Sequence, residues 1–256
     1  MLTPEQRLRY ERQLLFRPLG EAGQERLRER TALVAGVGAI GCVAASILSR
    51  AGVGTLHLVD HDTVELSNLQ RQLLYDEQDV AGGRPKAETA AEKLRLGNSD
   101  VAIIPHVERF TDDNAARLLQ DVDLVIDAVD NFKAKFALNR ACLAVGIPLI
   151  YGAVSGSFGM TMPVIPARTS APRTACLCCL YCEEPDAASS ETAATAGVIA
   201  PIVLTIAALQ CAQALKWLGG AADEMVTDVM QVDVWDGEFA LLPVARREGC
   251  AACGGM

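Results

Sequence analysis

The sequence predicts an α/β fold with a doubly wound, mainly parallel sheet that continues into a mixed or antiparallel carboxyl-terminal half. Three observations support this prediction. A short apolar run over residues 31–35 leads into a glycine-rich turn and then a helical pattern that ends near residue 51. Strand and helix patterns alternate as far as about residue 150, as they do in parallel sheets. Beyond residue 159, strand patterns follow one another without that helical rhythm.

The first thirty residues are expected to form short helices ahead of the sheet. Thr3 is a helix N-cap, Pro4 occupies the first helical position, and Gln6 completes a capping box. The segment that follows, residues 7–13, contains four charged side chains, among them Arg12. Taken alone, this segment indicates only a charged amphipathic helix. A second short helical pattern then leads into the first strand.

The first strand ends in Gly36, Gly38 and Gly41, with the spacing G-x-G-x-x-G. The first glycine permits a tight turn, the second lets backbone approach a phosphate, and the third lets the helix pack close to the sheet. The helix amino terminus offers free N–H groups to an anion. Asp60 follows the next strand, at residues 55–59, where a ribose hydroxyl binds. This Rossmann-like pattern predicts a nucleotide site, and a dinucleotide-dependent dehydrogenase is the first interpretation to consider.

A dense polar segment follows that second strand. It places Asp62, Asn68, Arg71 and Gln72 after Asp60. The segment lies past the carboxyl end of a parallel strand, where doubly wound sheets bind ligands. Fixed donors beside two carboxylates suit an ATP triphosphate with Mg²⁺, whereas a nicotinamide cofactor has no use for them. The polar segment therefore favours ATP over a dinucleotide.

Lys86 opens the next predicted helix, which extends to about Leu96. A lysine at a helix start opposes the macrodipole, and this indicates an anion that the lysine holds. A solvated lysine without a ligand is the alternative, and at this point both interpretations stay open.

The alternation continues with a strand at 101–107, a helix at 111–119, a strand at 123–127, a helix at 132–145 and a strand at 148–151. Asp127, Asp130 and Asn131 lie at the carboxyl end of the third of these elements. In a sheet that already holds phosphates, an aspartate in this place is a natural Mg²⁺ ligand. The alternative is that Asp130 is the N-cap of the helix that follows.

The carboxyl-terminal half is expected to carry the substrate site. Its predicted strands are at 160–164, 230–235 and 238–244. Residues 166–194 are rich in Ser, Thr, Ala and Pro, which predicts a mobile segment. Residues 196–220 are apolar, but interrupting polar residues favour a helix buried in the core or a dimer interface over a membrane span.

Composition excludes several classes of function. The chain has 256 residues and a net charge of −9, which argues against broad binding to nucleic acid or to an anionic membrane. The amino terminus lacks an apolar signal region, so a cytoplasmic location is expected. In that compartment, nine cysteines indicate thiols, metal binding or catalysis rather than disulfides.

The cysteines include two C-x-x-C pairs, Cys176 with Cys179 and Cys250 with Cys253. Together they predict a closed tetrahedral zinc site that ties the chain end to the irregular segment. A redox C-x-x-C is the competing interpretation, but it normally lies between a strand and a helix. Cys178 and Cys182 are left over beside the first pair, as alternative ligands, incidental thiols or a nucleophile.

The ordered set of motifs is more specific than any one of them. It comprises R-Y-E-R-Q at 9–13, G-x-G-x-x-G from 36, D-x-D-x-V-x-x-S-N-L-x-R-Q at 60–72, R-P-K at 84–86, D-x-x-D-N at 127–131, C-x-x-C-L-Y at 176–181, A-G-V at 196–198 and the final C-x-x-C. This combination resembles the MoeB/ThiF family, the bacterial relatives of ubiquitin-activating enzymes. The resemblance covers nearly the whole chain.

The resemblance implies a single adenylation domain over residues 1–256. The amino-terminal helices would occupy 1–30, the nucleotide-binding half 31–155, and the carrier-binding half 156–256, with a crossover loop at about 166–195 and the zinc site. The enzyme would be a homodimer that binds Mg·ATP and the carboxyl-terminal Gly-Gly of a small ubiquitin-like sulfur carrier protein. The carrier carboxylate would attack the α-phosphate, giving an acyl-adenylate and pyrophosphate.

The resemblance also implies roles for individual residues. Arg71 and Lys86 would hold the phosphates, and Arg12 would reach the site of the other subunit as an arginine finger. Asp130 would hold Mg²⁺. The nucleotide cradle would consist of Gly36, Gly38, Gly41, Asp60, Asp62, Asn68, Gln72, Lys86, Asp127 and Asn131.

Two positions depart from the family pattern. Sulfur-transfer members carry a cysteine two residues before T-A-G-V, where this chain has Ala193. Alanine cannot form a covalent carrier intermediate. Either the chain stops at adenylation and leaves sulfur to a separate donor, which is the favoured interpretation, or Cys182 or Cys178 takes the place of the cysteine, or the residue was changed deliberately. The arginine of the family's D-N-x-x-x-R is Lys135 here, which keeps the charge but not a bidentate contact.

Other functions stay open beside this one. The same ATP chemistry could act on a peptide carboxyl terminus or a tRNA-linked carboxylate, although the acidic charge argues against tRNA. A non-catalytic nucleotide-binding scaffold would be expected to lose Arg12, Arg71, Lys86 or Asp130, and the chain retains all four.

Overall fold

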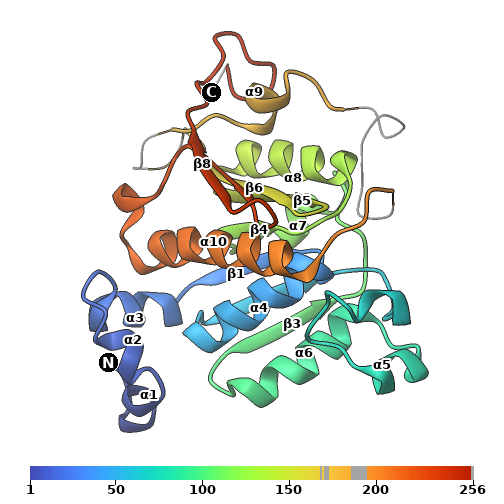
Figure 1. Cartoon of the computed structure of the whole chain (residues 1–256). Coiled ribbons are helices and arrows are strands. Elements are labelled where there is room, and N and C mark those ends of the chain that lie inside the picture. The colour runs from blue at the N-terminus through green and yellow to red at the C-terminus, as the bar shows by residue number, and fades with distance from the viewer. Residues whose placement is uncertain (168, 170–172, 186–194, 255–256) are drawn as a thin grey trace.

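The computed structural model describes residues 1–167, 169, 173–185 and 195–254. Among these residues, eight strands form one sheet in the order β3-β2-β1-β4-β5-β6-β7-β8 (Figure 1). Neighbouring strands from β3 to β5 pair in parallel, and those from β5 to β8 pair antiparallel. The predicted class, a parallel doubly wound sheet that continues into an antiparallel half, is confirmed.

The strands are β1 (Thr31–Ala35), β2 (Thr55–Val59), β3 (Ala102–His106), β4 (Leu124–Asp127), β5 (Leu149–Ser155), β6 (Phe158–Val164), β7 (Val229–Asp233) and β8 (Glu238–Leu242). The α-helices are α1 (Pro4–Arg9), α2 (Glu11–Leu14), α3 (Gly20–Arg28), α4 (Ala39–Ala51), α5 (Glu77–Gly82), α6 (Lys86–Gly97), α7 (Ala115–Leu118), α8 (Phe132–Val145), α9 (Leu177–Tyr181) and α10 (Ala200–Gly219). Two 3₁₀ turns, η1 (Leu66–Asn68) and η2 (Ala222–Glu224), complete the described elements.

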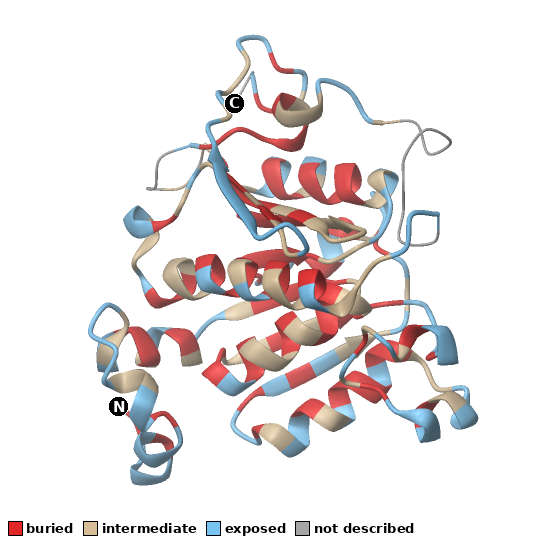
Figure 2. Ribbon diagram, in the orientation of Figure 1, coloured by how far each residue is buried: buried red, intermediate tan, exposed pale blue. Residues whose placement is uncertain are grey.

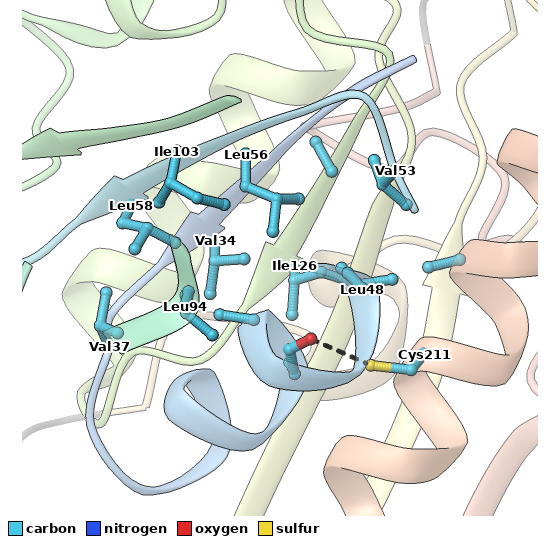
Figure 3. Packing of buried hydrophobic residues seen from close by; sticks show 14 of the residues in the cluster. Val34, Val37, Leu48, Val53, Leu56, Leu58, Leu94, Ile103, Ile126 and Cys211 are labelled. Atoms are coloured by element: carbon cyan, nitrogen blue, oxygen red, sulfur yellow. Dashed lines mark hydrogen bonds between the residues drawn. The ribbon is translucent and has the colours of Figure 1, made fainter. Parts of the chain in front are cut away.

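The parallel half has a hydrophobic core on each face of the sheet. Along β1, Val34 packs with α4, α6 and α10, whereas Leu33 packs on the opposite side with α7 and α8. Figure 3 shows the first core, where Leu56 and Ile126 of the neighbouring strands point toward Leu48. Strands buried on both faces read as continuous apolar runs, which is the pattern the sequence displays.

Helix α10 lies in the core, as predicted for residues 196–220. Length and composition alone would let Ala200–Gly219 cross a membrane, but the helix packs against α4, β5 and β6, and its inward face is buried (Figure 2). The Cys211 Sγ lies 3.7 Å from the carbonyl oxygen of Ala44 in α4 (Figure 3). A Cβ at Gly159 would lie 2.5 Å from Ile206, so the glycine lets the helix approach the sheet closely.

Several predicted elements differ from the observed ones. The expected helix at 111–119 is reduced to α7, because the Asn114 side chain accepts the Thr111 N–H (2.8 Å) and holds a turn there. The amino-terminal capping box forms as predicted, but the first helix ends at Arg9. The sequence did not predict α5 or α9, and α9 lies inside the segment that was expected to be mobile.

Candidate active site

Two of the three loop glycines are required by the surrounding backbone. Gly36 has φ +85°, and a Cβ there would lie 2.6 Å from the carbonyl oxygen of Ala128. A Cβ on Gly41 would lie 1.9 Å from the carbonyl oxygen of Gly36. At Gly38, the nearest atom to such a Cβ is Gln72 Nε2, at 3.5 Å. Gly36 and Gly41 therefore shape the turn, whereas Gly38 faces the Gln72 amide.

Asp60 fastens the glycine loop to the end of β2. Its Oδ2 accepts the Val37 N–H at 2.7 Å, and its Oδ1 accepts the Asp62 N–H at 2.8 Å. Burial raises the pKa of this carboxyl group, and the two backbone N–H groups oppose that rise. Carboxylate oxygens can accept more than one hydrogen bond. Asp60 can therefore hold the loop and still accept a hydroxyl of a ribose.

Lys86 is buried, so the solvated alternative is wrong. Its side chain is 7% exposed, and Nζ donates to Asp62 Oδ2 at 3.2 Å. The Lys86 backbone N–H also donates to the Asp62 carbonyl, at 2.8 Å. An ammonium group has three donors, so the contact with Asp62 leaves capacity for an anion at the start of α6.

The polar segment after β2 presents buried acceptors to this space. Asn68 and Gln72 are 8% and 4% exposed, and among the described residues Asn68 Oδ1 and Gln72 Oε1 have no hydrogen-bond partner. Arg71 folds back, with Nη1 donating to the Ser67 carbonyl at 3.0 Å. Buried polar atoms without partners are costly, so these two oxygens point to a polar ligand or water at this place.

The sequence left open whether Asp130 caps the following helix or is free to bind Mg²⁺, and the structure shows that Asn131 is the cap. The Asn131 side chain is the N-cap of α8 and accepts the Ala134 N–H at 2.9 Å. Asp130 is exposed, and its carboxylate accepts a hydrogen bond from Asn131 Nδ2 at 3.2 Å. Because Asn131 caps the helix, Asp130 stays available, and carboxylate oxygens are the ligands that Mg²⁺ prefers.

Asp127 is buried at the end of β4 and is paired within the protein. It is 0% exposed and forms an ion pair with Lys135, whose Nζ lies 3.1 Å from Oδ1 and 3.2 Å from Oδ2. Lys135 Nζ also donates to the Gly152 carbonyl at 2.6 Å. Burial raises the pKa of the Asp127 carboxyl, and the Lys135 charge opposes that rise. Asp127 therefore stabilises the end of β4 through Lys135 and the backbone, and it is not placed to contact a nucleotide.

Arg12 lies far from the other predicted site residues of its own chain. Its side chain is 85% exposed and contacts Glu11, at 3.6 Å. Figure 1 shows α2 on one side of the lower half of the molecule and α5, which follows the polar segment, on the other. Within one chain, the structure therefore does not bring Arg12 to the glycine loop.

The four predicted zinc ligands form one buried cluster. Three of the sulfur–sulfur distances are 3.9 Å (Cys176–Cys179), 3.7 Å (Cys176–Cys250) and 3.6 Å (Cys179–Cys253). Zinc–sulfur bonds of about 2.3 Å in a tetrahedron require sulfurs about 3.8 Å apart. The Arg247 backbone N–H donates to Cys179 Sγ at 3.4 Å. The cluster can hold a zinc ion.

Similarity to known proteins agrees with this arrangement. A family model described as ThiF family matches residues 10–252. The chain belongs to the ThiF family. Over 248 residues it is 42% identical to the sulfur carrier protein ThiS adenylyltransferase of Bacillus subtilis (strain 168), covering 96% of this chain and 71% of that protein. Over 253 residues it is 36% identical to the molybdopterin-synthase adenylyltransferase of Escherichia coli (strain K12), covering 99% and 98%.

Solved structures with the same fold were also found. Escherichia coli MccB with ATP superposes with a TM-score of 0.82 at 22% identity, covering 96% of this chain and 74% of that one. At this identity the likeness speaks for the fold alone. The predicted family and enzyme class, an adenylyltransferase of the ThiF/MoeB type, are confirmed by the family match and the curated relatives.

Sequence reasoning missed two residues of this ThiF site. The Tyr75 hydroxyl donates to the Val37 carbonyl (2.7 Å) and lies 3.2 Å from the Lys86 carbonyl, so it joins the glycine loop to the start of α6. Lys135 was treated only as a replaced arginine, although it pairs with Asp127. An apolar position occupied by tyrosine gives no signal of such a bond. Ala193 lies outside the described residues.

Proposed function

We propose that this chain adenylates the carboxyl-terminal glycine of a small ubiquitin-like sulfur carrier protein, using Mg·ATP and releasing pyrophosphate. One observation carries the proposal: buried Lys86 opens α6 beside the glycine loop, to which the Tyr75 hydroxyl links it, and the amino terminus of α4 follows that loop. Such a place suits a polyphosphate. The relatives named for ThiS and molybdopterin synthase supply the class of carrier.

Catalysis in this proposal rests on placement and charge neutralisation. The carrier carboxylate oxygen bonds to the α-phosphorus, and the bond from that phosphorus to the bridging oxygen breaks, so pyrophosphate leaves. Lys86 and Arg71 neutralise charge on the phosphates, while Asp60 orients the ribose. Asp130 would hold Mg²⁺, which when bound supplies further neutralisation of phosphate charge.

The carrier docks on the antiparallel half. The β7–β8 hairpin exposes Trp235 (80%), Phe239 (58%) and Leu241 (50%), an unusual density of apolar side chains in solvent. β8 is also the last strand of the sheet, with an unpaired edge. Exposed apolar patches of this kind mark protein interaction sites. This supports the prediction that residues 156–256 are the carrier-binding half.

A second copy of the chain completes each site. Arg12 is flanked by Leu8 (76% exposed), Leu15 (68%) and Phe16 (62%), so the amino-terminal helices offer an apolar contact around an exposed guanidinium. Leu66 (66%) and Leu73 (59%) are likewise exposed on either side of the polar segment. In the homodimer these surfaces meet, and Arg12 reaches the phosphates of the other subunit.

The proposal also includes a structural zinc ion and the absence of a covalent carrier intermediate at Ala193. A zinc ion in the cysteine cluster anchors the chain end, and the cytoplasm keeps its thiolates reduced. Ala193 cannot carry the carrier as a thioester, so the acyl-adenylate is the product that leaves the enzyme. Mass spectrometry of the carrier after incubation with enzyme, Mg·ATP and a sulfur source separates this outcome from an acyl-enzyme.

The direct test is ATP–pyrophosphate exchange. Exchange is expected with a carrier ending in Gly-Gly and not with the same carrier lacking its last glycine. If the rate of exchange is the same with and without the carrier, and the protein binds NADH, the proposal is overturned. Equal exchange with an unrelated peptide carboxyl terminus would keep the ATP chemistry and reject the carrier.

A further inference from the structure

A chain of buried polar contacts joins the loop that carries Asp130 to the cysteine cluster. Lys135 Nζ lies 5.2 Å from the centre of the Tyr151 ring, and both residues are buried. The hydroxyls of Tyr151 and Tyr181 are 2.5 Å apart, and Tyr151 is 0% exposed. Tyr181 is the last residue of α9, two residues after Cys179.

At one end of this series of contacts, Asp127 supports the loop that leads to Asp130. Its Oδ1 accepts the Val129 N–H at 3.2 Å as well as the Lys135 ammonium. The Asp127 carbonyl accepts Gln210 Nε2 at 2.8 Å, so the residue is fixed from α10 too. A change at Lys135 would therefore reach the backbone one residue before Asp130.

At the other end, α9 is fixed on two sides. Cys176 and Cys179, at its start and within it, belong to the buried cluster. The Leu177 N–H donates to Asn139 Oδ1 of α8, at 3.1 Å. Tyr181 packs edge-on against Phe132, with ring centres 5.1 Å apart, and Phe132 is the first residue of α8 after Asn131.

We propose that Tyr181 is a positioning residue for the Mg²⁺ ligand Asp130, acting through Tyr151, Lys135 and Asp127. The hydroxyl of Tyr181 fixes the Tyr151 ring beneath the Lys135 ammonium, and that ammonium fixes the Asp127 carboxylate under the loop. The cysteine cluster thereby sets the geometry of the metal site as well as anchoring the chain end. This inference rests on the proposed function, because it takes Asp130 as the Mg²⁺ ligand.

The test removes one oxygen atom. Tyr181→Phe keeps the ring contact with Phe132 and leaves the buried Tyr151 hydroxyl without its partner. Indirect supports of metal ligands change metal affinity by about 10–100-fold, and this one acts through three residues, so we expect a loss of roughly threefold to tenfold. Tyr10→Phe is the matched control, because the buried Tyr10 hydroxyl accepts Asn98 Nδ2 at 2.9 Å, in the amino-terminal region.

The first readout is Mn²⁺ binding, measured by electron paramagnetic resonance in the presence of a non-hydrolysable ATP analogue. The second is the Mg²⁺ dependence of pyrophosphate exchange. We expect Tyr181→Phe to weaken both, to regain the exchange rate at saturating Mg²⁺, and to keep its zinc. Tyr10→Phe is expected to lower thermal stability by a similar amount and to leave both metal readouts unchanged.

The outcomes separate this inference from the proposed function. If the unmodified enzyme binds no Mn²⁺ with the nucleotide, the assignment of Asp130 fails, and this inference fails with it. If the unmodified enzyme binds Mn²⁺ and Tyr181→Phe binds it equally well, only the inference is overturned. A rate defect in Tyr181→Phe that saturating Mg²⁺ does not repair also overturns it.

Discussion

At the scale of single residues, the site depends on which of two neighbours performs which task. Asn131 caps α8 through its amide oxygen, a place that an aspartate could equally fill. Because the asparagine does so, the carboxylate next to it remains exposed at the carboxyl end of β4. The chemistry of the site therefore depends on this local choice of cap.

Asp130→Ala is expected to abolish pyrophosphate exchange, since it removes the proposed Mg²⁺ ligand without disturbing the cap. The dimer should stay folded because the side chain is exposed. Asp113→Ala, which removes another exposed carboxylate that has no assigned role in the site, is the control. Near-normal exchange by Asp130→Ala would refute the Mg²⁺ role.

A histidine pair outside the site predicts a pH dependence of stability. His57 Nδ1 lies 2.8 Å from His106 Nε2, and the ring centres are 5.1 Å apart. Burial lowers the pKa of both imidazoles; for His57 the His106 charge adds to this, and for His106 Glu108 opposes it. Below the unfolded pKa of about 6.5, the unfolded chain thus binds more protons than the folded one.

Stability is therefore complete above about pH 6.5 and decreases as the pH falls through the folded pKa values. His106→Gln is expected to make the free energy of unfolding less dependent on pH between 7 and 5. Denaturant titrations of both proteins across this range measure the two slopes. Equal slopes would show that the histidine pair does not contribute.

At the scale of elements, α9 and the chain end form a unit that the cysteines hold. The helix is only five residues long (Leu177–Tyr181). Isolated helices of this length do not form in water, so α9 depends on its tertiary contacts. Those contacts are the buried thiols and the packing against α8.

Cys176→Ser is expected to reduce zinc from about one ion per chain to near zero and to lower the melting temperature by more than about 4 °C, because metal binding contributes directly to folding. Elemental analysis and thermal unfolding measure the two effects. Cys182→Ser is the control, since this thiol is exposed and lies outside the cluster. A native protein that contains no metal would contradict the zinc assignment.

At the scale of the whole molecule, one sheet connects the proposed nucleotide site with the proposed carrier-binding surface. Its parallel strands carry the nucleotide residues at their carboxyl ends, and its antiparallel strands end in the exposed β7–β8 hairpin. Arg12 lies away from both in its own chain (Figure 1). The proposal therefore requires Arg12 to come from a second molecule.

Mixing two inactive variants tests this association. Arg12→Ala and Asp130→Ala are each expected to lose exchange. When their subunits are mixed in equal amounts and re-associated, half of the dimers are mixed, and each mixed dimer has one intact site. Activity should return to about a quarter of the unmodified value. If no activity returns although mixed dimers form, Arg12 does not act across the interface.

Much of this could be predicted from the sequence. The glycine spacing predicted the turn, and Gly36 and Gly41 are indeed required there by backbone contacts. The C-x-x-C pairs predicted the cysteine cluster although more than 70 residues separate them, because closed Cys₄ sites have a strict donor requirement. Helix α9 was missed because its stability is not local. The partner of Asp127 was missed because an ion pair across β4 and α8 leaves no periodic pattern.

The sequence by itself determined the class of fold, the nucleotide loop and the four thiols, because each depends on spacing along one or two short segments. Only the tertiary structure decided whether Asp130 or Asn131 caps α8. It also decided that Lys86 is buried in contact with Asp62 and that Asp127 pairs with Lys135. These outcomes depend on which side chains from distant segments meet in a low-dielectric interior. Burial and pairing there set the cost of each charge, and a linear pattern does not encode that cost.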